Sequence, residues 1–323
     1  MTTKNVKYNY DSTINRKSHS EDSHPADPGM IFDDISVEKI DLNGRQVLKM
    51  DVSELLENVK NVIEQWEFPQ SIDYKKMNGL QKLEYGLSNY RNIHKSYIIQ
   101  FVGKISFSTI LNASNNQIKT IGQWFMHSEN YRNLTITERI QILKSTWAQW
   151  KRLERFATTA KLLGHRMIDE NIVTVMPGKV ARAGELKVTC DFFTVNEMKG
   201  HFNVYNLRMM EEVAKPLVEL APSNREIAFM LAYMSWHFAG KKYQGKILEA
   251  SEIELKQLSN DLHSYYMNEQ KIKNYAARVV KIMKIINAVL KIHFDRLNLM
   301  DILRLFDLSG VEATDPEIYQ TYF

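Results

Sequence analysis

Apolar residues recur along most of this chain with the spacing of an α-helix. The longest such pattern starts at Thr135, which forms the sequence signature of a capping box together with Glu138. Its apolar positions cover about half of the helix circumference: Ile142, Leu143, Trp147, Trp150, Leu153, Phe156, Ala157 and Ala160. An arc that wide cannot face water on all sides, so the pattern predicts a central helix with other helices packed over it.

Helical spacing also marks segments on both sides of this one. Helices are predicted at residues 51–66, 77–94, 203–220, 227–238, 251–267 and 272–299. Three of them carry a start signal in which a short polar residue is followed three residues later by Glu: Asp51 and Glu54, Ser223 and Glu226, and Ser251 and Glu254. The main part of the chain is therefore expected to be all-α.

Two stretches depart from the helical spacing. Residues 172–190, with Pro177 and Gly178 between two runs of β-branched residues, predict one short β-hairpin. Residues 1–29 are polar and lack periodic apolar positions, and residues 1–45 are expected to form a disordered tail or hinge ahead of one domain at residues 46–323. A small hairpin of residues 35–40 with 46–50 is the alternative for the end of that tail.

The residues leading into the central helix carry a more specific signal. Their order is an aromatic helix end, an aromatic residue three before a leucine, a capped turn, two apolar residues, a basic residue and a tryptophan: Trp124, Tyr131, Leu134, Thr135, Ile142, Leu143, Lys144 and Trp147. This order resembles the signature of nuclear hormone receptor ligand-binding domains. It is most similar to the divergent supplementary receptors of nematodes, and the likeness extends over most of the chain after Met77.

The resemblance implies an all-α fold, a three-layer antiparallel helical sandwich of the nuclear-receptor ligand-binding type with one small β-hairpin. Residues 110–126 match its third helix, and residues 272–299 match the helix that forms the dimer seam in this family. The function implied is regulation of transcription in the nucleus, with a hydrophobic ligand, coregulator helices, or both as partners, in a homodimer or heterodimer. A ligand-free helical scaffold that mediates protein–protein interaction is the alternative.

Composition narrows the expected partners. The 323 residues include one cysteine, Cys190, so this chain cannot build the four-cysteine zinc sites of a receptor DNA-binding domain, and direct DNA binding is not expected from it. The net charge of +4 is too small to indicate a nucleic-acid partner. The most apolar predicted segment, residues 279–294, is interrupted by three lysines, so no membrane partner is expected.

Catalytic patterns are not found in the sequence. It contains no Walker loop, no Gly-rich dinucleotide turn and no G-x-S-x-G elbow. A Glu three residues before a His occurs only at Glu21 and His24, inside the expected tail. The chain is therefore predicted not to be an enzyme and to hold no cofactor and no metal, with a helical lipid-modifying or metal enzyme as the least favoured class.

The resemblance places a ligand pocket between the helix at residues 110–126 and the central helix. The residues expected to line it are Ile110, Ala113, Ser114, Gln117, Trp147, Lys151, Arg155 and Thr158. Receptors for acidic lipids often carry an arginine at the position of Thr158, and Arg155, one turn earlier, could replace it. A buried Arg needs an anionic partner. Three alternatives stay open: Arg155 points outward, it pairs with a glutamate, or large side chains fill the pocket.

The resemblance also implies a second site, a groove for a coregulator helix. Its expected residues are Met126, Arg139, Ile140, Leu143, Lys144, Ile318, Tyr319, Thr321, Tyr322 and Phe323. Related receptors clamp the coregulator with a lysine and a glutamate, and here Met126 and Thr321 stand at those positions. Coactivator binding of the usual kind is therefore expected to be weak, and a corepressor, a partner receptor or a non-standard motif is favoured.

Overall fold

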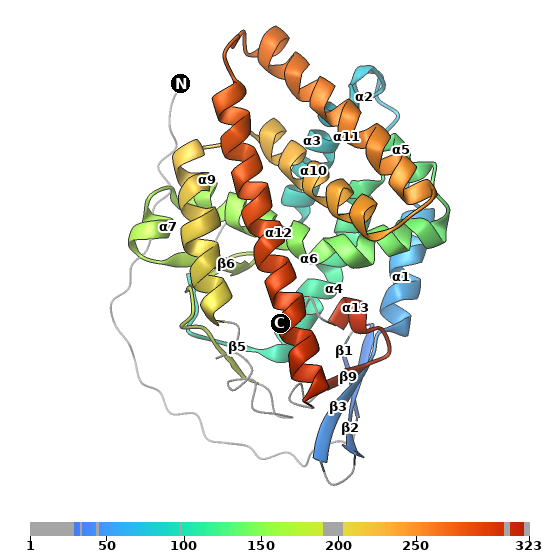
Figure 1. The fold of residues 1–323 in the computed structure, drawn as a ribbon. Helices are drawn as coiled ribbons and strands as arrows, with labels where there is room; N and C mark the ends of the chain where they lie inside the picture. Colours follow the sequence, from blue (N-terminus) through green and yellow to red (C-terminus); the bar gives the residue numbers. More distant parts are fainter. Residues whose placement is uncertain are drawn as a thin grey trace.

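The computed structural model describes residues 29–32, 34–42, 45–96, 99–189, 203–306 and 311–319. Helix α6 (Ile136–Leu163) runs through the middle of the molecule (Figure 1). Its capping box is confirmed, because Thr135 Oγ1 accepts a hydrogen bond from Glu138 N at 3.3 Å and Glu138 Oε2 accepts one from Thr135 N at 2.8 Å. The local start signal therefore sets the beginning of the central helix, as the sequence predicts.

The helices form three layers, which confirms the predicted fold class. The middle layer contains α6 and its neighbours α5 (Glu129–Arg132), α10 (Asn224–Lys242) and α11 (Lys246–Ser264). One outer layer contains α3 (Gly79–Ile93) and α4 (Phe107–Phe125), and the other contains α9 (Lys215–Leu220) and α12 (Ala276–Leu305) (Figure 1). Helices α6 and α10 are covered on both faces, so their buried residues surround the helix, whereas α11 buries one stripe.

Shorter segments complete the helical part. These are α1 (Ser53–Glu64), α2 (Ile72–Lys76), α7 (Arg166–Asp169), α13 (Pro316–Tyr319), and the π-helical turns η1 (Met210–Ala214) and η2 (Tyr265–Glu269). The start of α1 differs slightly from the prediction: Asp51 Oδ1 accepts from Ser53 N at 2.9 Å, and Glu54 takes no part in a cap. The box at Ser223 and Glu226 is confirmed at the start of α10.

The predicted helix start at Ser251 and Glu254 is wrong. Helix α11 begins earlier, at Lys246, and α10 continues past the stop expected near Gly240. The two residues have other partners: Ser251 Oγ donates to Trp236 O at 2.7 Å, and Glu254 Oε2 accepts from Ser128 Oγ at 2.9 Å. Gly240 serves the close approach of α10 to α11, because a Cβ there would lie 2.7 Å from Ser251 Oγ.

A four-stranded sheet stands where much of the disordered tail was expected. Its order is β1 (Gly29–Phe32), β2 (Ile35–Leu42), β3 (Arg45–Asp51) and β9 (Val311–Ala313), with β1, β2 and β3 antiparallel and β9 parallel to β3. The alternative hairpin is confirmed, and the tail prediction is wrong for the described residues 29–32, 34–42 and 45. Ile35, Val37, Leu48 and Met50 face the helices and are buried, which holds this sheet in place. Residues 1–28 lie outside the described part.

Two smaller sheets lie near the C-terminal end of α6. The hairpin of β6 (Ile172–Met176) and β7 (Lys179–Arg182) confirms the predicted one, and β4 (Gln100–Phe101) extends it in parallel to β7. The continuation after Arg182 pairs elsewhere, as β8 (Lys187–Thr189) runs parallel to β5 (Lys104–Ser106). These strands bring the segment before α4 next to the segment after α6.

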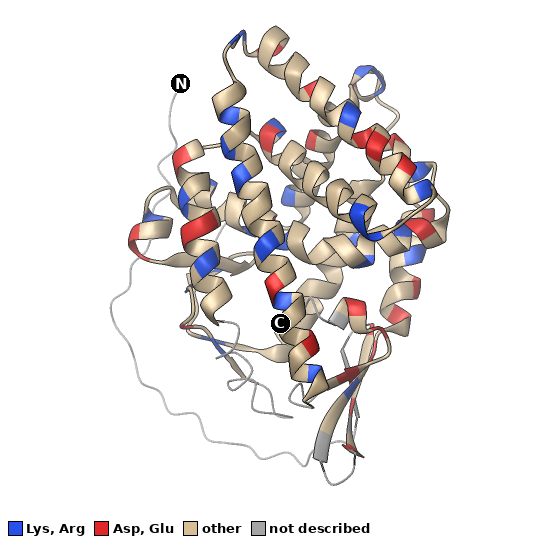
Figure 2. Ribbon diagram, viewed as in Figure 1, with Lys and Arg blue, Asp and Glu red and all other residues tan. Residues whose placement is uncertain are grey.

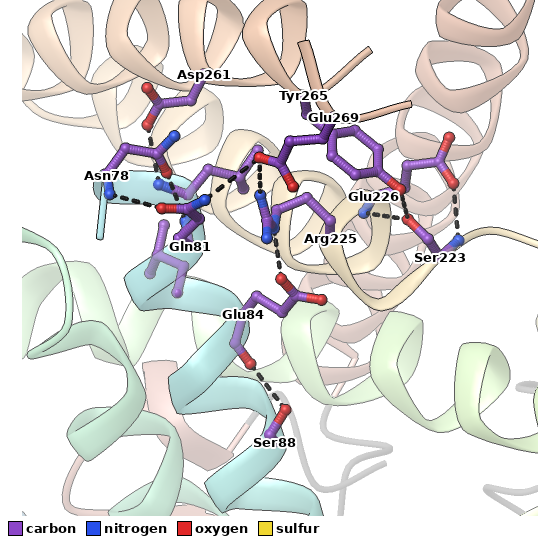
Figure 3. A network of polar contacts seen from close by, with 12 residues as sticks. Asn78, Gln81, Glu84, Ser88, Ser223, Arg225, Glu226, Asp261, Tyr265 and Glu269 are labelled. Atoms are coloured by element: carbon purple, nitrogen blue, oxygen red, sulfur yellow. Dashed lines mark hydrogen bonds and ion pairs between the residues drawn. The ribbon is translucent and has the colours of Figure 1, made fainter. Parts of the chain in front are cut away.

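A polar network joins the ends of three helices (Figure 3). Arg225, at the start of α10, forms ion pairs with Glu84 of α3 and, at 3.1 Å, with Glu269 of η2. Gln81 Nε2 donates to the same Glu269 at 3.3 Å, and Asp261 Oδ2 accepts from Leu80 N at 2.9 Å. The network fixes the N-terminal end of α3 against the middle layer.

Surface charge is mixed in sign. Lys and Arg recur along α12, whereas Asp and Glu are more frequent on α11 (Figure 2). Across the described residues, none of the helices combines the length and apolarity needed to span a bilayer.

Candidate functional site

A cavity of about 780 Å³ lies between α4, α6, α12 and the small sheets. This volume falls within the usual range of small-molecule pockets. One part of its wall is apolar and comes from α4 and the neighbouring strands: Ile105, Phe107, Ile110, Ala113, Val180 and Val188. The part contributed by α6 and α12 is rich in cations. The predicted alternative of a pocket filled by large side chains is therefore not what the structure contains.

Seven of the eight residues predicted for the ligand site line this cavity: Ile110, Ala113, Ser114, Gln117, Lys151, Arg155 and Thr158. The prediction for Trp147 differs from the structure. Trp147 is fully buried behind the wall, with its ring centroid 4.7 Å from Lys151 Nζ. It lies one turn before Lys151 on α6, so it supports the lysine from the core side.

Lys151 crosses the cavity wall between the two helices that form it. Its Nζ donates a hydrogen bond to Ser114 Oγ of α4 at 3.0 Å. Burial lowers the pKa of Lys151 well below its ordinary value, and the positive charges of Arg155, Arg152 and Arg296 lower it further. The site therefore disfavours the protonated form of Lys151 until a negative charge arrives.

Two arginines of α6 follow Lys151 at the cavity. Arg152 is buried, and its Nη1 donates to His293 Nδ1 of α12 at 3.1 Å, so His293 accepts as a neutral ring. Burial lowers the pKa of Arg155 to about 10, and Arg155 Nε has no hydrogen-bond partner in the described part of the chain. The guanidinium of Arg155 lies 5.5 Å from the ring centroid of Phe156. Within the described residues, neither arginine forms an ion pair.

Arg296 of α12 adds a fourth cation to the wall. It is buried, and burial together with the nearby charge of Arg155 lowers its pKa to about 10. The sequence prediction missed Arg152 and Arg296. Arg152 carried a usable signal, because Lys151, Arg152 and Arg155 lie at i, i+1 and i+4 on a helix already expected to be covered. Arg296 reaches the cavity only through the packing of α12 on α6.

Glu154 is the only carboxylate on the cavity wall among the described residues, and it is already bound. Its Oε1 accepts from Arg91 Nε at 2.9 Å and from Thr158 Oγ1 at 2.6 Å. Thr158 thus donates its hydroxyl proton to a protein carboxylate. The carboxylate of Glu154 is paired with Arg91, so it does not compensate the charges of Arg152 and Arg155.

The second predicted site does not present an empty groove. Met126 and Leu143 are buried, and α1 packs against α4 and α6 where the groove was expected. A Cβ at Gly122 would lie 3.2 Å from Ile63 Cδ1 of α1 and 3.2 Å from Leu143 Cδ2. We call the surface around Gly122 and Leu143, with the predicted residues Met126 and Ile140 beside it, the α4–α6 groove.

The predicted cations of this site are bound within the chain. Arg139 Nε donates to Leu134 O at 2.9 Å. Lys144 forms an ion pair with Asp315, and its Nζ lies 3.8 Å from Glu317 Oε2 of α13. Lys242 at the end of α10 forms a second ion pair with Glu317. The start of α13 is therefore held against α6 and α10 by charge.

The last helix is described only in part. Ile318 is fully buried, which agrees with the expected apolar contact of this segment. The backbone of Tyr319 ends α13, whereas Thr321, Tyr322 and Phe323 lie outside the described residues. The roles predicted for these four side chains stay predictions.

A family model and individual relatives that match this chain all belong to one protein family. Residues 95–306 match the family described as the ligand-binding domain of nuclear hormone receptor. Nuclear hormone receptor family member nhr-213 of Caenorhabditis elegans is 30% identical over 99% of this chain and 78% of its own length. Members nhr-54 and nhr-98 of the same organism are 30% and 28% identical, over 84% and 76% of this chain. The chain spans 66% and 58% of those two relatives.

Proposed function

This chain belongs to the nuclear hormone receptor family, and from that premise we propose that it regulates transcription in response to an anionic amphiphile bound in the cavity. Members of this family are ligand-regulated transcription factors and not enzymes. The observation that carries the proposal is the set of cations on α6 that face the cavity without a carboxylate partner among the described residues.

The head group should carry more than one negative charge. Lys151, Arg152 and Arg155 lie within two turns of α6, and burying an uncompensated charge costs several kcal/mol. A carboxylate would balance one of the three. A phosphate monoester carries nearly two charges and three acceptor oxygens, so it can bind Lys151 and Arg155 together. We therefore favour an alkyl or acyl phosphate over a simple fatty acid.

The remainder of the ligand should be apolar. Phe107, Ile110 and Ala113 of α4 and Val180 and Val188 of the strands form the wall away from the cations. Burial of an apolar chain against them contributes roughly 25 cal/mol for each Å² removed from water. The polar and apolar parts of the wall thus favour an amphiphile with its head at α6 and its chain toward the small sheets.

A head-group series tests this ligand class. The purified chain is titrated with dodecyl phosphate, dodecanoate and dodecanol, which share one alkyl chain, and binding is followed by calorimetry and thermal unfolding. Dodecyl phosphate should bind most tightly and stabilise the protein by about 3 kcal/mol at a hundredfold excess over Kd. Equal binding of dodecanol would contradict the role of the cations, and absence of all binding would favour the ligand-free scaffold.

A reporter assay tests the regulatory part. The chain is fused to an unrelated DNA-binding domain, and reporter output is compared with and without the bound class of ligand. The response should be lost in Arg155→Met and kept in Lys215→Gln, whose side chain is half exposed on α9 and does not line the cavity. A response that survives Arg155→Met would contradict control through this cavity. Residence in the nucleus is part of the same proposal and is checked by imaging the tagged chain.

Helix α12 supports a proposed dimer seam. Val280, Phe294, Ile302 and Leu305 are each more than half exposed on it. Lys and Arg recur along the same helix (Figure 2). An exposed apolar set of this kind marks interaction surfaces. The seam predicts a concentration-dependent dimer by sedimentation that Phe294→Glu with Leu305→Glu disrupts, and a wild-type chain that stays monomeric would leave a partner receptor as the occupant.

A further inference from the structure

Helix α1 occupies the α4–α6 groove through its apolar face. Leu55, Val59 and Ile63 are fully buried, although α1 lies at the edge of the molecule (Figure 1). Gly122 makes this approach possible, because any side chain there would meet Ile63 at 3.2 Å. The surface predicted to receive a coregulator helix is therefore covered by a helix of the same chain.

The sequence of α1 suits a helix-in-groove contact. Val59, Val62 and Ile63 lie at i, i+3 and i+4, the spacing with which amphipathic helices insert apolar anchors into a groove. Leu55 lies one turn before Val59 and extends the same face. The opposite face carries Glu54 and Glu57, which are exposed. Helix α1 thus has the apolar spacing expected of a bound coregulator segment.

Cations beside the groove are neutralised within the chain. Lys119 of α4 forms an ion pair with Asp34, and Asp34 Oδ1 also accepts from Asn58 Nδ2 of α1 at 2.8 Å. At the other end Lys144 is paired with Asp315. A helix arriving from another protein would have to replace these carboxylates, so its chemistry should be apolar at i, i+3 and i+4 with acidic residues at its ends.

Helices α1 and α13 are joined through one short ladder. Strand β3, which leads into α1, pairs in parallel with β9, which leads into α13 (Figure 1). Thr314 extends the ladder, since Thr314 N donates to Met50 O at 2.9 Å and Thr314 Oγ1 accepts from Val52 N at 3.0 Å. Movement of α13 away from Lys144 would therefore pull on the segment that anchors α1.

We propose that α1 is an internal occupant of the α4–α6 groove and that an acidic amphipathic helix of a coregulator binds only after α1 leaves. Release of α1 and α13 is coupled through β3 and β9. The inference rests on the proposed function only in taking the partner to be a coregulator. The occupancy itself is independent of any ligand in the cavity.

Peptide binding measures the competition directly. The probe is a fluorescein-labelled peptide with the sequence of residues 53–66, and its affinity for the full chain is followed by anisotropy. Wild type should bind it weakly, because its own α1 fills the site. Val59→Asp with Ile63→Asp should bind it roughly tenfold or more tightly, since the competent fraction of the protein rises. Glu57→Gln, on the exposed face of α1, is the matched control and should bind like wild type.

A second variant keeps the test decisive if the double variant unfolds. Asp34→Asn removes the ion pair to Lys119 without changing a core residue, and it should give a smaller gain in peptide affinity. Hydrogen exchange should show faster exchange of residues 53–64 when the peptide is in excess. Equal affinity for all folded variants, or peptide binding that leaves exchange of α1 unchanged, would overturn the inference. Failure of dodecyl phosphate to bind would affect only the proposed ligand class.

Discussion

Replacement of Arg155 by methionine should strengthen the empty protein and weaken its ligand binding. Arg155 Nε is buried without a hydrogen-bond partner in the described part, and an unmet buried donor costs about 1–3 kcal/mol. Methionine has a similar reach and no charge, so it recovers much of that cost. Loss of the guanidinium beside Phe156, at 5.5 Å, costs about 0.5–1 kcal/mol. A net gain of about 1 kcal/mol in the free energy of unfolding remains for Arg155→Met.

Ligand binding should change in the opposite direction. A charge-assisted hydrogen bond to the head group is worth about 1.5–3 kcal/mol, which corresponds to roughly a tenfold to hundredfold loss of affinity for dodecyl phosphate. Urea unfolding of the empty protein gives the first quantity, and calorimetric titration gives the second. The matched control is Arg166→Met, whose side chain is half exposed on α7 and which should stay within about 0.5 kcal/mol of wild type.

The sign of the two effects decides whether the reasoning holds. A destabilised empty protein with unchanged affinity would show that Arg155 serves packing and not ligand capture. Loss of both stability and affinity would indicate that the variant disturbs the wall itself, and it would refute the claim that the charge of Arg155 is uncompensated.

Three further predictions concern how buried contacts affect the stability of the protein. Burial lowers the pKa of His127, whose Nδ1 shares a hydrogen bond with the Tyr74 hydroxyl at 2.6 Å, to about 4. The unfolded chain therefore takes up a proton on this ring first as the pH falls below about 6.5. Stability should fall by up to about 3 kcal/mol between pH 6.5 and 4, and less in His127→Gln; equal slopes in urea unfolding would contradict this. Gly240→Ala should cost about 1–3 kcal/mol in thermal unfolding, because its Cβ would meet Ser251 at 2.7 Å; an unchanged Tm would be against it. Arg225→Ala should cost about 2 kcal/mol and speed hydrogen exchange at the start of α3, and slow exchange there would refute the role given to the network.

Local signals predicted the parts of the fold that depend on neighbours in sequence. The boxes at Thr135 and Ser223 start their helices because each needs only residues within one turn. The same rule failed at Ser251 because its hydroxyl donates to Trp236 on another helix, a contact that spacing cannot reveal. The ladder between β3 and β9 was also beyond prediction, since it joins segments about 260 residues apart, such as Val52 and Thr314.

The candidate site also contains residues that the sequence predicted and residues that only the tertiary structure reveals. The residues of α4 and α6 at the cavity were predicted through the resemblance to a known family. Arg296 did not, because its place depends on how α12 crosses α6. The position of α1 over Gly122 did not either: its apolar face predicts burial somewhere, and only the tertiary structure identifies the surface that receives it.

The pairing of β3 with β9 has a practical consequence for how this protein can be shortened. The region that matches the family, residues 95–306, excludes α1, α3 and both strands of that ladder. A fragment with those limits would expose the apolar surface of α4 and α6 that α1 covers, and it should aggregate on expression. A fragment of residues 29–319 keeps both β3 and β9. Useful boundaries for crystallisation and labelling therefore follow the folded unit and not the limits of the family match.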